Sequence, residues 1–171
     1  HSLVDDICMS VDQSNVSYPA RLDTYHRFDL IPTARRAYDQ MKNKYVVEIR
    51  ETLASVEHAA AKTNKLVQIA NGFVYHSGLV GVDESDQAEI THYHMDKMEL
   101  LRSILDDAQG APALVFYRFD EDRRRLLHLP GAVDIRTPNS VERWNKGNIP
   151  ILIAHPQSAG HGLNLQKGGN L

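Results

Sequence analysis

Apolar residues in the first half of the chain recur mostly at helical spacing. After Pro32, a residue suited to the first turn of a helix, apolar side chains follow three or four positions apart as far as Ile49. A second stretch of this kind spans residues 57–70, and a third, centred on Leu101, ends before Gly110. The spacing therefore predicts three amphipathic helices.

Two segments of the first half have a different pattern. Residues 24–30 predict a short strand, because Phe28 and Leu30 alternate with charged neighbours. Residues 73–91 contain two short apolar pieces that flank a Ser-Gly pair and the acidic run 83–86. We expect a hairpin or a long loop there.

The last third of the chain alternates apolar runs with helix-like segments. The apolar runs cover residues 113–117, 132–135 and 149–154, and amphipathic segments at 120–128 and 138–146 separate them. Such alternation is typical of a parallel sheet covered on both faces, with right-handed crossovers. We therefore expect the three strands to be parallel neighbours in one sheet.

The composition indicates one globular domain. The chain has 171 residues, of which 42% are hydrophobic and 24% charged, and this balance argues against disorder. No apolar run approaches the ~20 residues of a membrane span, and the first ten residues lack the basic and apolar regions of a signal peptide. Cys8 is the only cysteine, which excludes an internal disulfide and a cysteine-rich zinc site. We expect a cytoplasmic location and no membrane partner.

The charge of the chain is unevenly distributed. Residues 1–110 carry 11 Lys and Arg against 17 Asp and Glu, a net charge of −6, whereas residues 111–171 carry 8 against 5, a net charge of +3. A basic second half could contact phosphates, although ordinary surface charge explains the asymmetry as well.

The segment after the last apolar run has the composition of an anion-binding loop. Ligands of open parallel sheets bind beyond the carboxyl ends of the strands, where residues 155–165 follow. Gly160 and Gly162 would let backbone N–H groups approach an anion, and a helix beginning near Leu163 would add its N-terminal dipole. A plain tight turn is the alternative for this segment.

Five segments resemble, in the same order, parts of the second lobe of SNF2-type superfamily 2 helicases. Residues 158–165, Ser-Ala-Gly-His-Gly-Leu-Asn-Leu, resemble motif V, and residues 113–119 resemble motif IV. Residues 96–101 resemble the helix before motif IV, residues 18–38 the segment that joins the two lobes, and residues 68–72, Gln-Ile-Ala-Asn-Gly, a stretch of short bacteriophage-type members.

The resemblance implies a fold and a division of the chain. It implies an α/β fold of RecA-like type, a three-layer sandwich with a mainly parallel sheet that is incomplete at its C-terminal end. Residues 1–31 would be the interlobe segment, and residues 32–171 the second RecA-like lobe, truncated after motif V.

The resemblance also implies an ATP-dependent DNA translocase, in which ATP and Mg²⁺ bind between two lobes of one polypeptide. The residues that match the ATP side of motif V are Gly160, Gly162 and Asn164. The residues that match DNA-backbone contacts are Arg118, Gln157 and Ser158. The partners would be double-stranded DNA and the first lobe, and this chain would hold no catalytic residue, metal site or tightly bound cofactor of its own.

The chain departs from the family pattern in three ways. His155, Pro156 and Gln157 replace the usual Ser-Thr-Arg, and a proline has no N–H to offer a phosphate. The sequence contains no phosphate loop of the form G-x-x-x-x-G-K-[ST], and it stops before the arginines of motif VI. We therefore expect no ATPase activity from this chain alone. A self-contained α/β binding or adaptor domain without ATPase function is the alternative.

Other polar groups are weaker candidates. His92 and His94 would share a face of a strand, but no Cys or third His stands nearby, so we do not expect a metal site. Asp83 and Glu84 resemble an acidic metal motif and fit a solvated hairpin better. Residues 123–125 are three consecutive arginines, for which a solvated helix surface is the first expectation and a phosphate contact the second.

Overall fold

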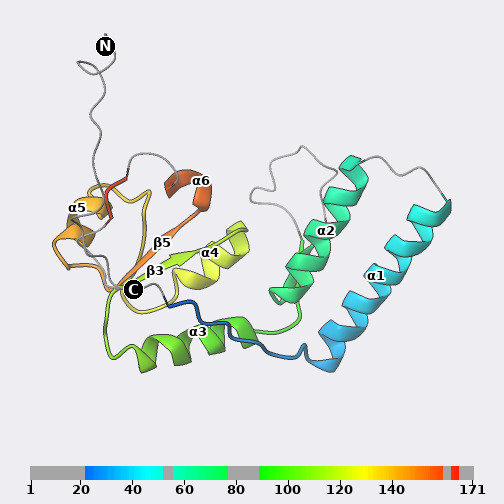
Figure 1. The fold of residues 1–171 in the computed structure, drawn as a ribbon, viewed down its shortest axis with the longest axis horizontal. Helices are drawn as coiled ribbons and strands as arrows, with labels where there is room; N and C mark the ends of the chain where they lie inside the picture. Colours follow the sequence, from blue (N-terminus) through cyan, green and yellow to red (C-terminus); the bar gives the residue numbers. More distant parts are fainter. Residues whose placement is uncertain (1–21, 52–55, 77–88, 160–162, 166–171) are drawn as a thin grey trace, which may run out of the picture.

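The structure is a computed structural model that describes residues 22–51, 56–76, 89–159 and 163–165. It is a mixed α/β fold with a three-stranded parallel sheet and a two-stranded antiparallel sheet (Figure 1). In chain order the elements are α1 (Pro32–Glu51), α2 (Val56–Ala70), β1 (Phe73–Tyr75), β2 (Ile90–His92), α3 (Asp96–Asp107), β3 (Ala113–Phe116), α4 (Asp120–Leu126), β4 (Ala132–Asp134), α5 (Ser140–Asn145), β5 (Ile151–Ala154) and α6 (Pro156–Ala159). The three helices predicted in the first half and the three predicted apolar strands are confirmed.

The parallel sheet has the order β3-β5-β4, with β5 in the centre. Leu152 on β5 pairs with Leu114 on β3 and with Val133 on β4, and both pairings are parallel. All four residues of β5 are buried, as its uninterrupted apolar sequence requires. The expectation of three parallel neighbours in one sheet is confirmed.

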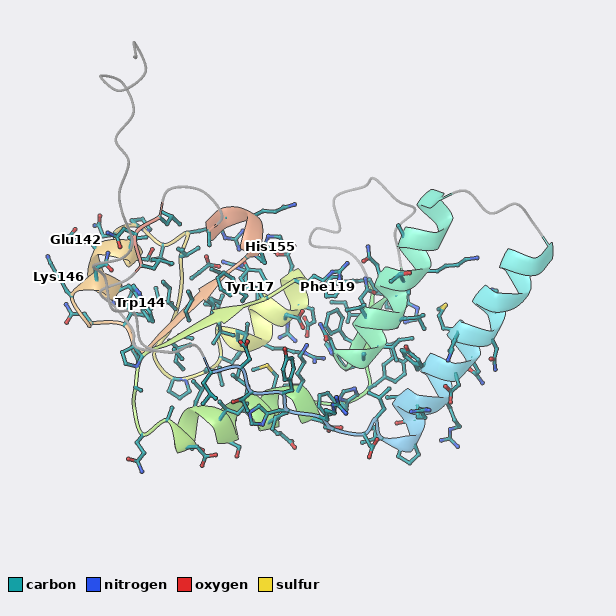
Figure 2. All side chains as sticks on the ribbon, in the orientation of Figure 1. Tyr117, Phe119, Glu142, Trp144, Lys146 and His155 are labelled. Carbon is teal, nitrogen blue, oxygen red and sulfur yellow. The ribbon has the colours of Figure 1, made fainter. Side chains whose placement is uncertain are left out.

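Helices pack against this sheet in two separate apolar clusters. Ile151 and Ile153 of β5 join a cluster with Met98 of α3 and Leu126 of α4. Leu152, the residue between them, belongs to a second cluster. That cluster is built around Trp144 of α5, which is 1% exposed (Figure 2). Alternate residues of β5 thus face different clusters, which follows from the two-residue repeat of a strand.

The two-stranded sheet packs against α2 through β1. Phe73 of β1 pairs with His92 of β2 in antiparallel register. The hairpin expected over residues 73–91 is therefore present at its two ends, while its centre, with Asp83 and Glu84, lies outside the described residues. None of the helices in the described ranges is long and apolar enough to cross a bilayer.

Residues 24–30 do not form the predicted strand. They belong to a segment without regular secondary structure that follows the course of α3 (Figure 1). Its Phe28 ring lies edge-on to the ring of His94, with centroids 6.2 Å apart, and lines an apolar cavity together with Leu101 of α3. No strand in the described ranges pairs with this segment, and Phe28 itself remains 39% exposed, so the alternation of apolar and charged residues does not mark a buried face here.

The turn between α2 and β1 explains the Gln-Ile-Ala-Asn-Gly segment in structural terms. Gln68 is buried and its Oε1 accepts a hydrogen bond from the Tyr75 N–H at 3.2 Å. Gly72 has a φ of +92°, and a Cβ placed on it would lie 2.2 Å from the carbonyl oxygen of His94. Only glycine fits this position, because a side chain would meet both a strained backbone and a fixed neighbour.

Candidate functional site

A polar hollow lies at the carboxyl edge of the parallel sheet, where ligands of such sheets bind. It has a volume of about 290 Å³ and is lined by residues 117–120, Arg136, His155 and residues 157–158. Tyr117 follows β3 and His155 follows β5, and their rings lie edge-on with centroids 5.6 Å apart (Figure 2). Three chain segments that are distant in sequence therefore meet around one space.

All three residues predicted to contact DNA line this hollow. Arg118 comes from the end of β3, whereas Gln157 and Ser158 come from the segment after β5, and all three are exposed. The Arg118 guanidinium donates a hydrogen bond to Asn64 Oδ1 at 2.5 Å and lies 5.5 Å from the centroid of the Phe119 ring. Both partners are neutral, so its positive charge is not compensated by them.

Pro156, which departs from the family's usual Ser-Thr-Arg, fits its place in the structure. Pro156 is the first residue of α6, a position where no intrahelical N–H bond is needed. The N–H of Gln157 donates to His155 Nδ1 at 3.3 Å, and the N–H of Ser158 donates to the His155 carbonyl at 2.9 Å. The backbone donors of this turn are thus already used, and side chains are left to contact a ligand.

One buried carboxylate organises the β4 side of the hollow. Asp134 has 4% of its side chain exposed and forms ion pairs with Arg123 of α4 and with Arg136. Arg136 Nη2 also donates to the hydroxyl of Tyr117 at 3.0 Å. Burial raises the pKa of Asp134, but the hydrogen bonds from Arg136 and Arg123 outweigh it and leave the pKa below its usual value.

The charges around Asp134 do not cancel. Two guanidinium groups share a single carboxylate, so the cluster of Arg123, Arg136 and Asp134 carries a net charge of +1. The Asp120 carboxylate also lines the hollow and offsets this charge, and Arg118 makes the group as a whole positive again. Arg136 could have been identified from the sequence, because it directly follows an apolar strand at the ligand-binding edge. Its partner Asp134 lies within the apolar run 132–135, so the sequence pattern did not single it out.

The residues assigned to ATP do not join the hollow within the described part of the chain. Gly160 and Gly162 lie outside that part. The carbonyl of Asn164 accepts a hydrogen bond from Asn145 Nδ2 at 2.9 Å, and the next carbonyl, of Leu165, accepts one from the Trp144 indole at 2.9 Å. Residues 163–165 therefore lie beside α5 without helical structure, and the residues on either side of them lie outside the described part of the chain.

The three consecutive arginines form a solvated helix surface only in part, because Arg125 is buried while 57% of the Arg124 side chain is exposed. Arg123 pairs with Asp134, while Arg124 and Arg125 both pair with Glu121, which has 1% of its side chain exposed. Arg125 is itself buried and donates to the carbonyls of Asn71 at 3.0 Å and Gly72 at 3.2 Å. The expectation of a solvated surface is wrong for Arg125, because its partners come from a distant turn that periodicity cannot show.

The two histidines are placed apart from the hollow. The Nδ1 atom of His92 lies 2.7 Å from Arg125 Nη2, so that nitrogen accepts a hydrogen bond from the guanidinium. His94 has 1% of its side chain exposed and lies beyond the end of β2. Among the residues that the structure describes, no group of three or more His, Cys, Asp or Glu is placed to hold a metal ion.

The chain is similar to a bacteriophage protein. It is 34% identical over 171 residues to "Putative protein p41" of Acyrthosiphon pisum secondary endosymbiont phage 1. The match covers 98% of this chain and 35% of the phage protein, so the chain spans about a third of the length of that relative. No protein-family model matches the chain. The similarity shows distant homology to a phage protein.

Proposed function

We propose that the chain is a RecA-like lobe of an SNF2-type DNA translocase and that its polar hollow binds the phosphate backbone of double-stranded DNA. One observation carries the proposal. Arg118, Gln157 and Ser158, chosen from two separate motifs, line the same hollow at the ligand-binding edge of the sheet. The pairing of β3 with β5 brings the ends of the two motifs to one edge of the sheet.

The chemistry of the hollow suits a phosphodiester group. A guanidinium offers several N–H donors in a planar fork that matches phosphate oxygens. The Ser158 hydroxyl and the Gln157 amide belong to exposed residues and add uncharged donors. Contacts of this type hold the backbone without reading the base sequence, as a protein that moves along DNA requires.

The proposed translocase would use ATP. When ATP and Mg²⁺ bind between two lobes, they supply the free energy for lobe closure. Of the three residues assigned to the nucleotide, only Asn164 lies in the described part of the chain, and it lies beside α5 and not in the hollow. The proposal therefore rests on the DNA side of the lobe.

Arg118→Gln is expected to weaken binding of a short DNA duplex about three- to tenfold at low salt. The logarithm of the affinity should also fall less steeply with the logarithm of salt concentration, by about one unit of slope, because one phosphate contact is lost. Fluorescence anisotropy with a labelled duplex measures both. Arg102→Gln, an exposed arginine of α3 outside the hollow, is the matched control.

Two results would contradict the proposal. Equal effects of the Arg118 and Arg102 substitutions would mean that DNA responds only to total charge. Absence of salt-dependent duplex binding by the unsubstituted chain would favour the alternative, a self-contained binding or adaptor domain.

A further inference from the structure

We infer that Arg136 is a second phosphate ligand of the hollow, and that Asp134 and Tyr117 are positioning residues that hold it in place before DNA binds. This role rests on the proposed function and adds a residue to which neither the motifs nor the phage relative assigns a part. In this arrangement Arg118, which follows β3, and Arg136, which follows β4, contact the same phosphate from two sides of the hollow.

The contacts of Arg136 fix one side of its guanidinium. Nε donates to Asp134 Oδ1 at 3.2 Å, and Nη2 donates to Asp134 Oδ2 at 3.1 Å. The main-chain N–H of Arg136 also donates to Asp134 Oδ1 at 2.8 Å. Both the side chain and the backbone of Arg136 therefore bind the same carboxylate. Nη1 has no hydrogen-bond partner among the described residues, and 50% of the side chain is exposed. The free side of the fork is therefore available to an oxyanion.

The positive charge of Arg136 survives its pairing with Asp134. An arginine that has a carboxylate to itself is neutralised and attracts anions weakly. Here Arg123 donates to the same Asp134 oxygen that Arg136 Nη2 contacts, so one negative charge is divided between two guanidinium groups. The pair of arginines keeps one surplus positive charge. Asp120 on the same hollow opposes it, and Arg118 restores a net positive charge that favours a phosphate.

Arg136 is better prepared for a ligand than Arg118. Arg118 is exposed and donates to the neutral side chain of Asn64, so it must be ordered further when it binds a phosphate. Arg136 is already ordered by an ion pair and by Tyr117. Binding to a preorganised group loses less side-chain entropy, which strengthens the contact without adding a new one.

Tyr117 supplies an uncharged part of this arrangement. Its ring is buried, and its hydroxyl accepts a hydrogen bond from Arg136 Nη2 at 3.0 Å. Burial, with a further contribution from Asp134, raises the pKa of Tyr117, so the hydroxyl stays neutral at physiological pH. Tyr117→Phe would remove the hydrogen bond and leave every charge in the hollow unchanged.

The test is duplex binding by anisotropy over a series of salt concentrations. Arg136→Gln should weaken binding about tenfold and reduce the salt slope by about one unit. Tyr117→Phe should weaken binding by about two- to fourfold with the slope unchanged, because a positioning contact is lost and no charge is removed. Arg143→Gln, an exposed arginine on α5 away from the hollow, is the control for total charge and should bind like the unsubstituted chain.

Arg136→Lys distinguishes the loss of a phosphate contact from a folding defect, because it keeps the positive charge beside Asp134. It should retain the salt slope and bind more weakly than the unsubstituted chain, because lysine lacks the planar fork. If Arg136→Gln binds with unchanged affinity and slope while Arg118→Gln is impaired, the inference is wrong and the proposed function stands. If neither substitution has an effect, both are wrong. Equal loss in Arg136→Gln and Arg143→Gln would also overturn the inference.

Discussion

Replacement of Arg125 by methionine is expected to lower the free energy of unfolding by about 3–5 kcal/mol. The Arg125 guanidinium is buried, pairs with Glu121 at 2.9 Å and donates to the carbonyls of Asn71 and Gly72. Methionine fills much of the same volume but leaves a buried carboxylate and two buried carbonyl oxygens short of donors. The Phe73 ring, with its centroid 5.0 Å from the guanidinium carbon, loses its cationic neighbour as well.

Arg124→Met is the matched control for this prediction. Arg124 pairs with the same Glu121 carboxylate, at 2.6 Å, but 57% of its side chain is exposed. We expect it to cost less than about 1 kcal/mol, the usual range for an ion pair open to solvent. Urea denaturation of both variants gives the comparison. Similar losses in the two would mean that burial of Arg125 does not matter and that Arg125 does not anchor α4 to the α2–β1 turn.

Gly72→Ala is expected to lower the free energy of unfolding by about 3 kcal/mol or more. The substitution combines two costs. A φ of +92° is unfavourable for any residue with a Cβ, and the new methyl group would lie 2.2 Å from the carbonyl oxygen of His94. That carbonyl belongs to the backbone just beyond β2, so relief requires the β1–β2 sheet to shift.

Gly147→Ala separates the two costs. Gly147 has a φ of +74°, but nothing lies within 4 Å of the position that its Cβ would take. Only the backbone cost remains, which we expect to be about 1 kcal/mol. Thermal or urea denaturation measures the difference between the variants. A Gly72→Ala protein as stable as Gly147→Ala would contradict the close approach of Gly72 and His94.

The parallel sheet could be predicted because its strands carry a strong local pattern. Each is a short apolar run beside an amphipathic segment, and β5, buried along its whole length, has no polar residue at all. The strand order β3-β5-β4 was not predicted, since pairing depends on contacts between residues about 20 to 40 positions apart.

The errors share one physical cause. Residues 24–30 have the alternation of a strand but pair with no strand in the described ranges. Arg125 has the spacing of a surface residue but binds carbonyls more than 50 positions away. Local pattern shows which residues are apolar or charged. It does not show which partners a segment will meet in three dimensions.

The candidate site could be predicted in part from the sequence. The resemblance to motifs IV and V singled out Arg118 and residues 157–158, and the structure brings them together at the carboxyl edge of the sheet, where ligands bind as a rule. Arg136 follows a strand at the same edge and could have been placed there by that rule, but its contacts with Asp134 and Tyr117 join the ends of different strands and could not be predicted. The ATP-side residues Gly160 and Gly162 lie outside the described part, so their assignment stays a prediction.

Binding of the DNA backbone in the hollow is tested most directly by mapping the DNA contact surface with ¹H–¹⁵N NMR. Unlabelled duplex DNA would be titrated at low salt into the ¹⁵N-labelled chain. We predict that the largest shift changes fall on residues 117–120, Arg136, His155 and residues 157–158, and that they disappear as salt is raised. Changes confined to α1 and α2, or no changes at any salt concentration, would contradict DNA binding at this site.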